Sequence, residues 1–181
     1  PGVPKPILSP VQKREQAARR AGAALGFHEC VSYSFIDQAA AALFGAGSDA
    51  TRLENPISAD MSHMRPDLLP GLLAAAQRNQ ARGFADLALF EIGPVFSGGE
   101  PEEQDLQIAG LLIGRSAPKD VHASDRDVDL FDAKADALSI LGAIVAPVKT
   151  QVRRGAAPWW HPGRHGQICL GPKKTFAVFG E

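Results

Sequence analysis

Cysteine, tyrosine and methionine are scarce in this sequence of 181 residues, which holds two Cys, one Tyr and two Met. Cys30 and Cys169 lie far apart and form no CxxC pair, which argues against a disulfide or zinc framework and favours reduced thiols in the cytosol. No apolar run comes near the roughly 20 residues that span a bilayer. No charged start followed by an apolar block marks a signal peptide. We therefore expect a cytoplasmic protein that makes no membrane contact.

A surplus of charge of either sign is also missing. The sequence has 19 Lys and Arg against 20 Asp and Glu, so any contact with nucleic acid has to come from a local patch of cations. A hydrophobic content of 45% suits one globular domain over residues 1–181. Because the chain begins at Pro1 without Met and stops within an apolar strand pattern at Glu181, we expect a fragment of a longer protein.

The best-marked element is a helix over residues 10–25. Ser9 is a favourable N-cap, Pro10 suits the first helical position, and Gln12 completes a capping box. Gly26 is placed to end the helix in a left-handed turn. The predicted inner face consists mostly of small residues, which permit close packing but bury little area each. Its members are Val11, Ala17, Ala18, Ala21, Ala24 and Leu25.

Alternating and helical patterns predict the other elements. Over residues 30–36, Val31, Tyr33 and Phe35 alternate with serines, which predicts a half-buried strand. The further elements that we expect are a short helix from Asp37 to Gly45, a short strand running into a loop over 51–60, a helix from Pro70 to Gly83, strands over 87–96 and 106–114, a loop over 116–129, a helix over 129–144 and a hairpin over 167–181 that turns at Gly171-Pro172.

Helices separated by antiparallel strands predict an α+β domain, in which helices flank an antiparallel or mixed sheet. The apolar faces of the helices over 70–83 and 129–144 are expected to consist of Leu69, Leu72, Leu73 and Ala76 and of Phe131, Leu138 and Leu141, respectively.

Several motifs, in one order along the chain, carry a resemblance to a known family. They are ENPISADMSHMRPDLLPGLLAAAQRNQARG, LFEIGPVF, LFDAKADALSILG, HPGRHGQICLG and FGE. Together they cover nearly the whole chain, which resembles the synthetase core of bacterial phenylalanyl-tRNA synthetase β subunits. The resemblance implies a class II aminoacyl-tRNA synthetase-like fold in a subunit that assembles with a catalytic α subunit as α2β2. It also implies that the holoenzyme, and not this fragment, uses ATP and Mg²⁺ to attach phenylalanine to tRNA(Phe).

The stretch after LFEIGPVF lacks a residue that active relatives use. In active class II synthetases a similar strand is followed by an Arg that contacts the ATP α-phosphate, in a pattern similar to G-x-x-F-R-x-E. Gly93 and Phe96 keep this frame, but Ser97 occupies the Arg position, and a neutral hydroxyl cannot hold a phosphate bidentately. The acidic residues that follow would repel an anion, and they are Glu100, Glu102, Glu103 and Asp105. We therefore predict no catalytic residue in this fragment.

Two other groups of polar residues have a structural interpretation. His161 and His165 are four residues apart, but Pro162 and Gly163 break any helix between them, so we predict no metal site. Arg65, ahead of a helix, is interpreted as one partner of a structural ion pair at the sheet edge rather than as an anion-binding residue.

The helix over 10–25 and the strand over 30–36 resemble the helix-plus-strand motif that forms dimer interfaces in class II synthetases. Because small residues suit a tight contact between helices, we predict that part of this face belongs to the α subunit. The interface candidates are Val11, Arg14, Ala17, Ala18, Ala21, Leu25, Tyr33 and Phe35.

Two other functions stay open at this point. One is a core that itself catalyses amino-acid adenylation, which the loss of cations around Ser97 opposes. The other is an RNA-binding module that acts through the polar side of the first helix, although a solvated face is the favoured interpretation of these charges. The cations concerned are Lys13, Arg14, Arg19 and Arg20.

Overall fold

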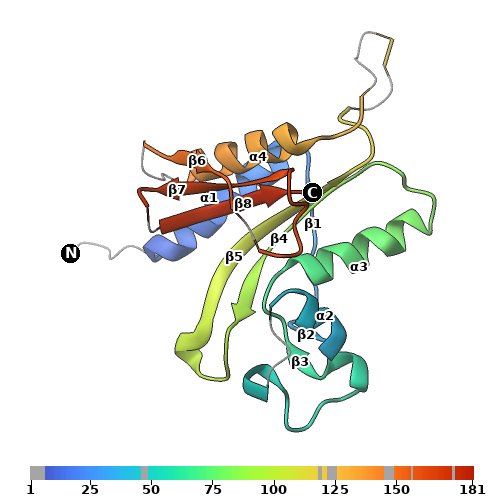
Figure 1. Ribbon diagram of the computed structural model, residues 1–181, viewed down its shortest axis with the longest axis vertical. Coiled ribbons are helices and arrows are strands. Elements are labelled where there is room, and N and C mark those ends of the chain that lie inside the picture. Colours follow the sequence, from blue (N-terminus) through green and yellow to red (C-terminus); the bar gives the residue numbers. More distant parts are fainter. Residues whose placement is uncertain are drawn as a thin grey trace.

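A long two-stranded ribbon forms the middle of the computed structural model (Figure 1). The structure describes residues 7–45, 49–117, 120–121, 126–144, 149–155, 157–172 and 174–181. In the ribbon, β4 (Leu87–Phe96) and β5 (Gln104–Ile113) are antiparallel and pair along their full ten residues. The short strand β1 (His28–Glu29) joins β4 in parallel. The sheet is therefore mixed, as the sequence predicts.

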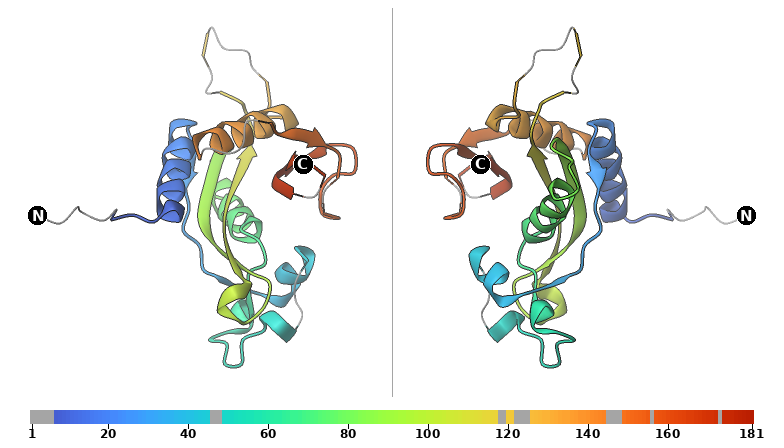
Figure 2. Two further views of the ribbon diagram at one scale, coloured as in Figure 1. Left: turned by 90° about the vertical axis from the view of Figure 1, so that its left-hand side faces the viewer. Right: turned by 90° about the vertical axis from the view of Figure 1, so that its right-hand side faces the viewer.

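Helices lie on both faces of this ribbon (Figure 2). Gly22 of α1 (Pro10–Ala24) lies so close to β4 that a Cβ there would sit 3.1 Å from the ring of Phe90. The neighbouring residue Leu89 packs instead in a cluster with residues of α3 (Leu69–Gln80). Because successive residues of a strand point to opposite faces, β4 holds α1 on one side and α3 on the other.

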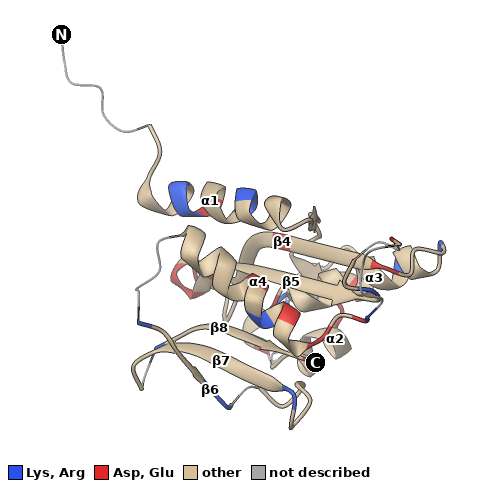
Figure 3. Ribbon diagram, turned by 90° about the horizontal axis from the view of Figure 1, so that it is seen from above, with Lys and Arg blue, Asp and Glu red and all other residues tan. Residues whose placement is uncertain are grey.

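A second sheet is covered by the remaining long helix. Seen from above, α4 (Leu130–Ala143) lies between α1 and this three-stranded sheet (Figure 3). Its strands are β6 (Gln151–Arg153), β7 (His165–Leu170) and β8 (Lys174–Gly180). Leu141 of α4 packs on Ile168 and Phe179 and forms the second hydrophobic cluster of the described residues. The antiparallel pairing of β7 with β8 confirms the predicted hairpin.

Local signals account for where the helices begin and end. The Ser9 Oγ accepts a hydrogen bond from the Gln12 backbone N–H at 3.2 Å, and the Gln12 side chain accepts one from the Ser9 N–H at 2.9 Å. Gly26 has φ = +90°, which favours glycine and ends α1. Asp37 caps α2 (Gln38–Leu43) through the Ala40 N–H. These features confirm the predicted first helix and the short helix after it.

The remaining described elements are small. They are β2 (Phe35–Ile36), which pairs with β3 (His63–Met64), and 3-10 helices at Asp49–Thr51, Ala59–Met61 and Pro101–Glu103. The predicted loop over 116–129 lies partly outside the described residues, and in the described part an isolated bridge joins Arg115 to Asp127.

The prediction of a continuous strand over 30–36 is wrong. Only Phe35 and Ile36 belong to a strand, and Val31 and Tyr33 are 93% and 74% exposed, whereas Phe35 is half-buried. The reason lies far away in the sequence: the Glu91 carboxylate accepts hydrogen bonds from both the backbone N–H and the Oγ of Ser32. This contact turns the serine inward and the large side chains outward.

Two smaller expectations also need correction. No strand forms over 51–60 beyond an isolated bridge from Arg52 to His63. In α4, Phe131 is 70% and Leu138 38% exposed, because Leu130, Ala133 and Ala137 pack towards the second sheet instead, while Leu141 is buried as expected. Leu73 of α3 is 45% exposed, whereas Leu72 and Ala76 are buried as expected.

Candidate functional site

The loop after β4 is closed by its own acidic side chain. The Ser97 backbone N–H donates to the Glu103 carbonyl oxygen at 2.8 Å, and the Ser97 Oγ donates to the same oxygen at 3.1 Å. The Glu103 carboxylate accepts from the Glu100 N–H at 3.0 Å and occupies the space beside Gly98, where a Cβ would overlap it. An anion is therefore already present at the position where a phosphate-binding loop needs free N–H groups.

Behind this loop, a buried ion pair fills the face of β4 that carries α3. Arg65 and Glu91 are both about 2% exposed, and the Arg65 Nη1 donates to the Glu91 Oε1 at 2.7 Å. The Arg65 Nε donates to the Pro94 carbonyl oxygen at 2.9 Å. Ser32 links the two partners, since its Oγ accepts from Arg65 at 3.0 Å and donates to Glu91 at 2.7 Å. The predicted structural ion pair of Arg65 is confirmed, although it lies in the interior rather than at the sheet edge.

Two glycines leave the room that this network needs. A Cβ on Gly93 would overlap the guanidinium group of Arg65, and a Cβ on Gly71 would overlap the Ser32 Oγ. Next to the network, Asp67 accepts a hydrogen bond from the Leu69 N–H at 2.8 Å at the start of α3, and burial raises the pKa of this carboxyl group. The Nε and Nη1 atoms of Arg65 donate to protein oxygens, so the role of this site is structural.

The interface candidates do not form one surface. Ala18 is only 5% exposed within the chain itself, while Ala17, Ala21 and Phe35 are half-buried. Val11 is 55%, Leu25 38% and Tyr33 74% exposed, and Arg14 is exposed as well. Ala18 thus belongs to the packing of α1 on its own chain, and docking rests on the exposed members.

Sequence reasoning missed two exposed apolar residues near these candidates. Val31 shares the outward face of the segment between β1 and β2 with Tyr33. Ile57, 91% exposed, lies beside an apolar cavity of about 250 Å³ that is also lined by Phe35 and Met61. The alternation over residues 30–36 marked Val31 as important, but only the contact of Ser32 with Glu91 reveals which way it points.

The paired histidines make backbone contacts. The His161 Nδ1 accepts from the Gly163 N–H at 3.1 Å, and the His165 Nδ1 lies 2.6 Å from the His161 carbonyl oxygen. Among the described residues, no group of three or more His, Cys, Asp or Glu is placed to hold a metal ion. In the same part of the chain, no helix is long and apolar enough to cross a membrane. The absence of a metal site stays a prediction.

The fold is that of a class II tRNA synthetase core. A solved structure of a pyrrolysyl tRNA synthetase from Desulfitobacterium hafniense superposes with a TM-score of 0.65 over 93% of this chain and 57% of that chain, at 15% sequence identity. A second structure of pyrrolysyl-tRNA synthetase from this bacterium gives a TM-score of 0.61 over 89% of this chain and 55% of that one, also at 15% identity.

Sequence similarity identifies the family within this class. Residues 2–181 match the family described as the phenylalanyl tRNA synthetase beta chain CLM domain, and the chain belongs to this family. It is similar to the phenylalanine--tRNA ligase beta subunits of Ruegeria pomeroyi, with 71% identity, and of Cereibacter sphaeroides, with 67%, each over 99% of this chain. The chain spans 23% and 22% of the length of these two relatives.

Proposed function

We propose that this chain is a catalytically silent core domain of a phenylalanyl-tRNA synthetase β subunit, which docks the catalytic α subunit and supports its active site. In this proposal, residues 1–181 form one domain of a cytoplasmic α2β2 enzyme that attaches phenylalanine to tRNA(Phe). ATP and Mg²⁺ bind to the α subunit and not to this domain. Membership of the family supports the role in the holoenzyme.

The loop after β4 is the main support for the proposal that this domain is catalytically inactive. A nucleotide phosphate needs a cation or free N–H groups, and this loop offers Ser97 in the Arg position and a Glu103 carboxylate that already accepts from the Glu100 N–H. The nearest buried cation, Arg65, is bound to Glu91 and faces the interior. Direct adenylation by this core is therefore the weaker alternative.

Docking is supported by the exposed side chains of the segment between β1 and β2. Val31 and Tyr33 project from the chain at 93% and 74% exposure, and large apolar or aromatic side chains that lie in the open on a well-packed domain favour contact with a partner protein. This segment is continuous with the predicted interface motif that includes α1. We propose that Val31 joins the candidates Tyr33, Val11 and Leu25.

The test has a catalytic arm and a binding arm. The isolated chain is expected to show no phenylalanine-dependent exchange of pyrophosphate into ATP. The variant Ser97→Arg is expected to restore neither exchange nor ATP binding, because the Glu103 carboxylate still closes the loop. One added cation also does not rebuild a site that needs several positioned groups. In the binding arm, the tagged full-length subunit should co-purify with the α subunit. Exchange by the isolated chain would contradict silence, and failure to capture α would contradict docking.

A further inference from the structure

Charge is distributed unevenly along the chain, although the whole chain is nearly neutral. Residues 1–136 contain thirteen Lys and Arg against nineteen Asp and Glu. The 44 residues from Ala137 to Gly180 contain six Lys and Arg and no Asp or Glu. This acid-free segment comprises the end of α4 and the whole sheet of β6, β7 and β8, whose strands carry blue positions and no red ones in Figure 3.

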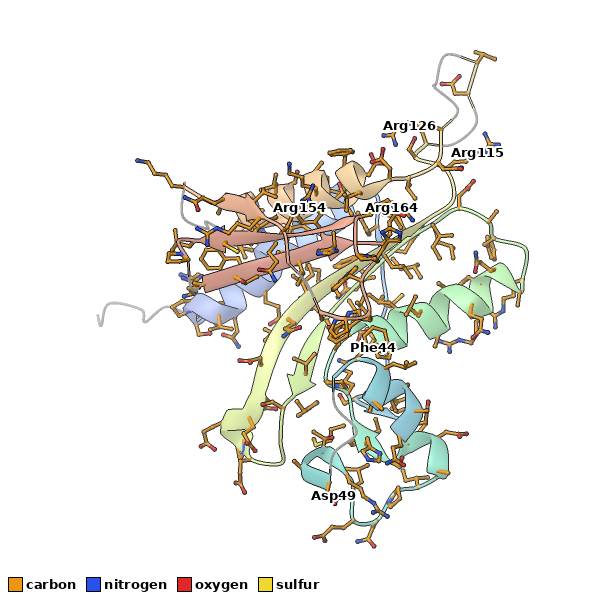
Figure 4. The ribbon with its side chains drawn as sticks, viewed as in Figure 1. Phe44, Asp49, Arg115, Arg126, Arg154 and Arg164 are labelled. Atoms are coloured by element: carbon orange, nitrogen blue, oxygen red, sulfur yellow. The ribbon has the colours of Figure 1, made fainter. Side chains whose placement is uncertain are left out.

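The cations of this segment are exposed, and most of them are free of acidic partners. Lys149, Arg153, Arg154 and Lys174 are all exposed, and none of them makes an ion pair within the described part of the chain. Arg164, in contrast, pairs with Glu181. Figure 4 shows Arg154 and Arg164 on the side of β6 and β7, far from Asp49 at the opposite end of the molecule. The sixth cation, Lys173, lies outside the described residues.

The strands add neutral hydrogen-bonding groups to these charges. Ile168 is buried against α4, so the adjacent Gln167 faces away from the helix, opposite Arg153 on β6. The Thr175 Oγ1 lies 3.5 Å from the Gln167 Oε1 on the same side of the sheet. All three residues of β6 are exposed, and on this strand the Arg153 Nη2 donates to the Gln151 Oε1 at 2.7 Å.

We infer that the surface of β6, β7 and β8, with Lys149, Arg153 and Arg154 at its exposed strand, binds the phosphate backbone of a folded RNA. This surface is separate from α1. The inference rests on the proposed function, because the RNA that we expect to bind is the tRNA of the assembled enzyme. Arg and Lys surrounded by Gln and Thr side chains are the groups that contact nucleic-acid phosphates and sugars.

Charge and polarity favour RNA over an acidic protein as the occupant. The centre of a protein interface is apolar and depleted of charged residues, whereas this sheet presents the exposed cations Lys149, Arg153 and Arg154 beside two exposed valines, Val152 and Val178. The acidic loop at Glu100–Glu103 lies at the far end of the β4–β5 ribbon (Figure 1). Repulsion there and attraction at β6 orient a polyanion towards the second sheet.

The experiment measures binding of a tRNA transcript to the full-length subunit assembled with its α partner, over a series of salt concentrations. The slope of log K against log salt concentration is negative, and each lost phosphate contact reduces its magnitude by about 0.7–0.9. The variant Lys149→Ala/Arg153→Ala/Arg154→Ala is therefore expected to reduce the magnitude of that slope by about 2–3 and to weaken binding about tenfold or more at about 50 mM salt. Arg153→Lys/Arg154→Lys keeps the charge and should keep the slope.

A matched control removes three exposed cations elsewhere, in Lys13→Ala/Arg20→Ala/Arg82→Ala. It is expected to leave the slope and the affinity close to those of the parent. Equal losses in both triple variants, or none in the β6 variant, would overturn the inference. A β6 variant that loses the α subunit but binds tRNA with the parent slope would show that this surface docks a protein, which also overturns it. Failure of the unaltered subunit to bind α refutes the docking proposal alone, because tRNA binding is then measured with the full-length β subunit by itself.

Discussion

At the scale of single residues, the interior of this domain is organised by a buried charge pair. Arg65 and Glu91 come from segments 26 residues apart, and Ser32 joins them from a third segment. Three segments that are far apart in the sequence are thereby held together on one face of β4. Removing one member of a buried pair leaves an uncompensated charge, which is far more costly than replacing both members with apolar side chains.

Arg65→Met is therefore expected to lower the free energy of unfolding by about 3–5 kcal/mol, because the Glu91 carboxylate loses its only buried cation partner among the described residues. Urea unfolding followed by circular dichroism measures the loss. The double variant Arg65→Met/Glu91→Leu should recover a large part of it. If the double variant is as unstable as the single one, the pair is not the source of the loss.

Gly93 sets the space for the guanidinium group. Gly93→Ala places a Cβ in overlap with Arg65, and overpacking of this kind typically costs about 1–3 kcal/mol. Gly142→Ala is the matched control, since nothing lies within 4 Å of its added Cβ on α4, and a helical Gly→Ala change gains about 0.5–1 kcal/mol. Thermal unfolding should thus shift in opposite directions for the two variants, and a shift of equal sign would contradict the overlap.

At the scale of elements, α4 depends on its first turn. Asp129 and Asp132 form a capping box, and Arg126 donates two hydrogen bonds to the Asp132 carboxylate, at 2.6 and 2.7 Å. These bonds lower the pKa of Asp132 from 3.8 to about 2. Because the folded pKa lies below the unfolded one, the stabilisation is complete above about pH 4 and is lost as the pH falls through 2.

The change Arg126→Ala is accordingly expected to raise the pKa of Asp132 towards its ordinary value near 3.9. Titration of the Asp132 carboxyl carbon by NMR measures this pKa directly. At neutral pH the effect on stability should be small, because the Arg126 side chain is 48% exposed and solvent screens the pair. An unchanged pKa in the variant would show that the capping box, rather than Arg126, depresses it.

At the scale of the whole molecule, α1, α3 and α4 cover the two three-stranded sheets, and the segment between β1 and β2 is left with its large side chains exposed. Val31 and Tyr33 face outward because Ser32 faces Glu91. The buried hydrogen bond between Ser32 and Glu91 therefore leaves the Val31 and Tyr33 side chains exposed on the surface. The same network that stabilises the domain presents its proposed docking residues.

Val31→Asp/Tyr33→Asp is expected to leave the chain folded, because both side chains are exposed. The double variant should abolish co-purification with the α subunit. Burial of an unpaired polar group in an apolar contact costs about 2–7 kcal/mol, and burial of an unpaired charge costs more. Circular dichroism and pull-down measure the two effects. The control Val121→Asp alters another residue that is 90% exposed. Normal capture of α by the double variant would move the docking surface elsewhere.

The sequence by itself determined the elements whose signals are local. The capping box at Ser9, the caps of α2 and α4 and the β4–β5 and β7–β8 hairpins all depend on residues close together in the chain, so pattern and propensity suffice to predict them. The absence of a cation at Ser97 was equally readable, since it needs only a residue type at a motif position.

Only the tertiary structure decided the rest. Alternation predicted a half-buried strand over residues 30–36, but a carboxylate 59 positions from Ser32 binds this serine and leaves Val31 and Tyr33 exposed. The closure of the loop by Glu103 and the burial of Arg65 likewise depend on which groups meet in space. Periodicity shows which residues share a face of an element. Which face is buried depends on partners that are distant in the sequence, because buried polar groups have to be hydrogen-bonded.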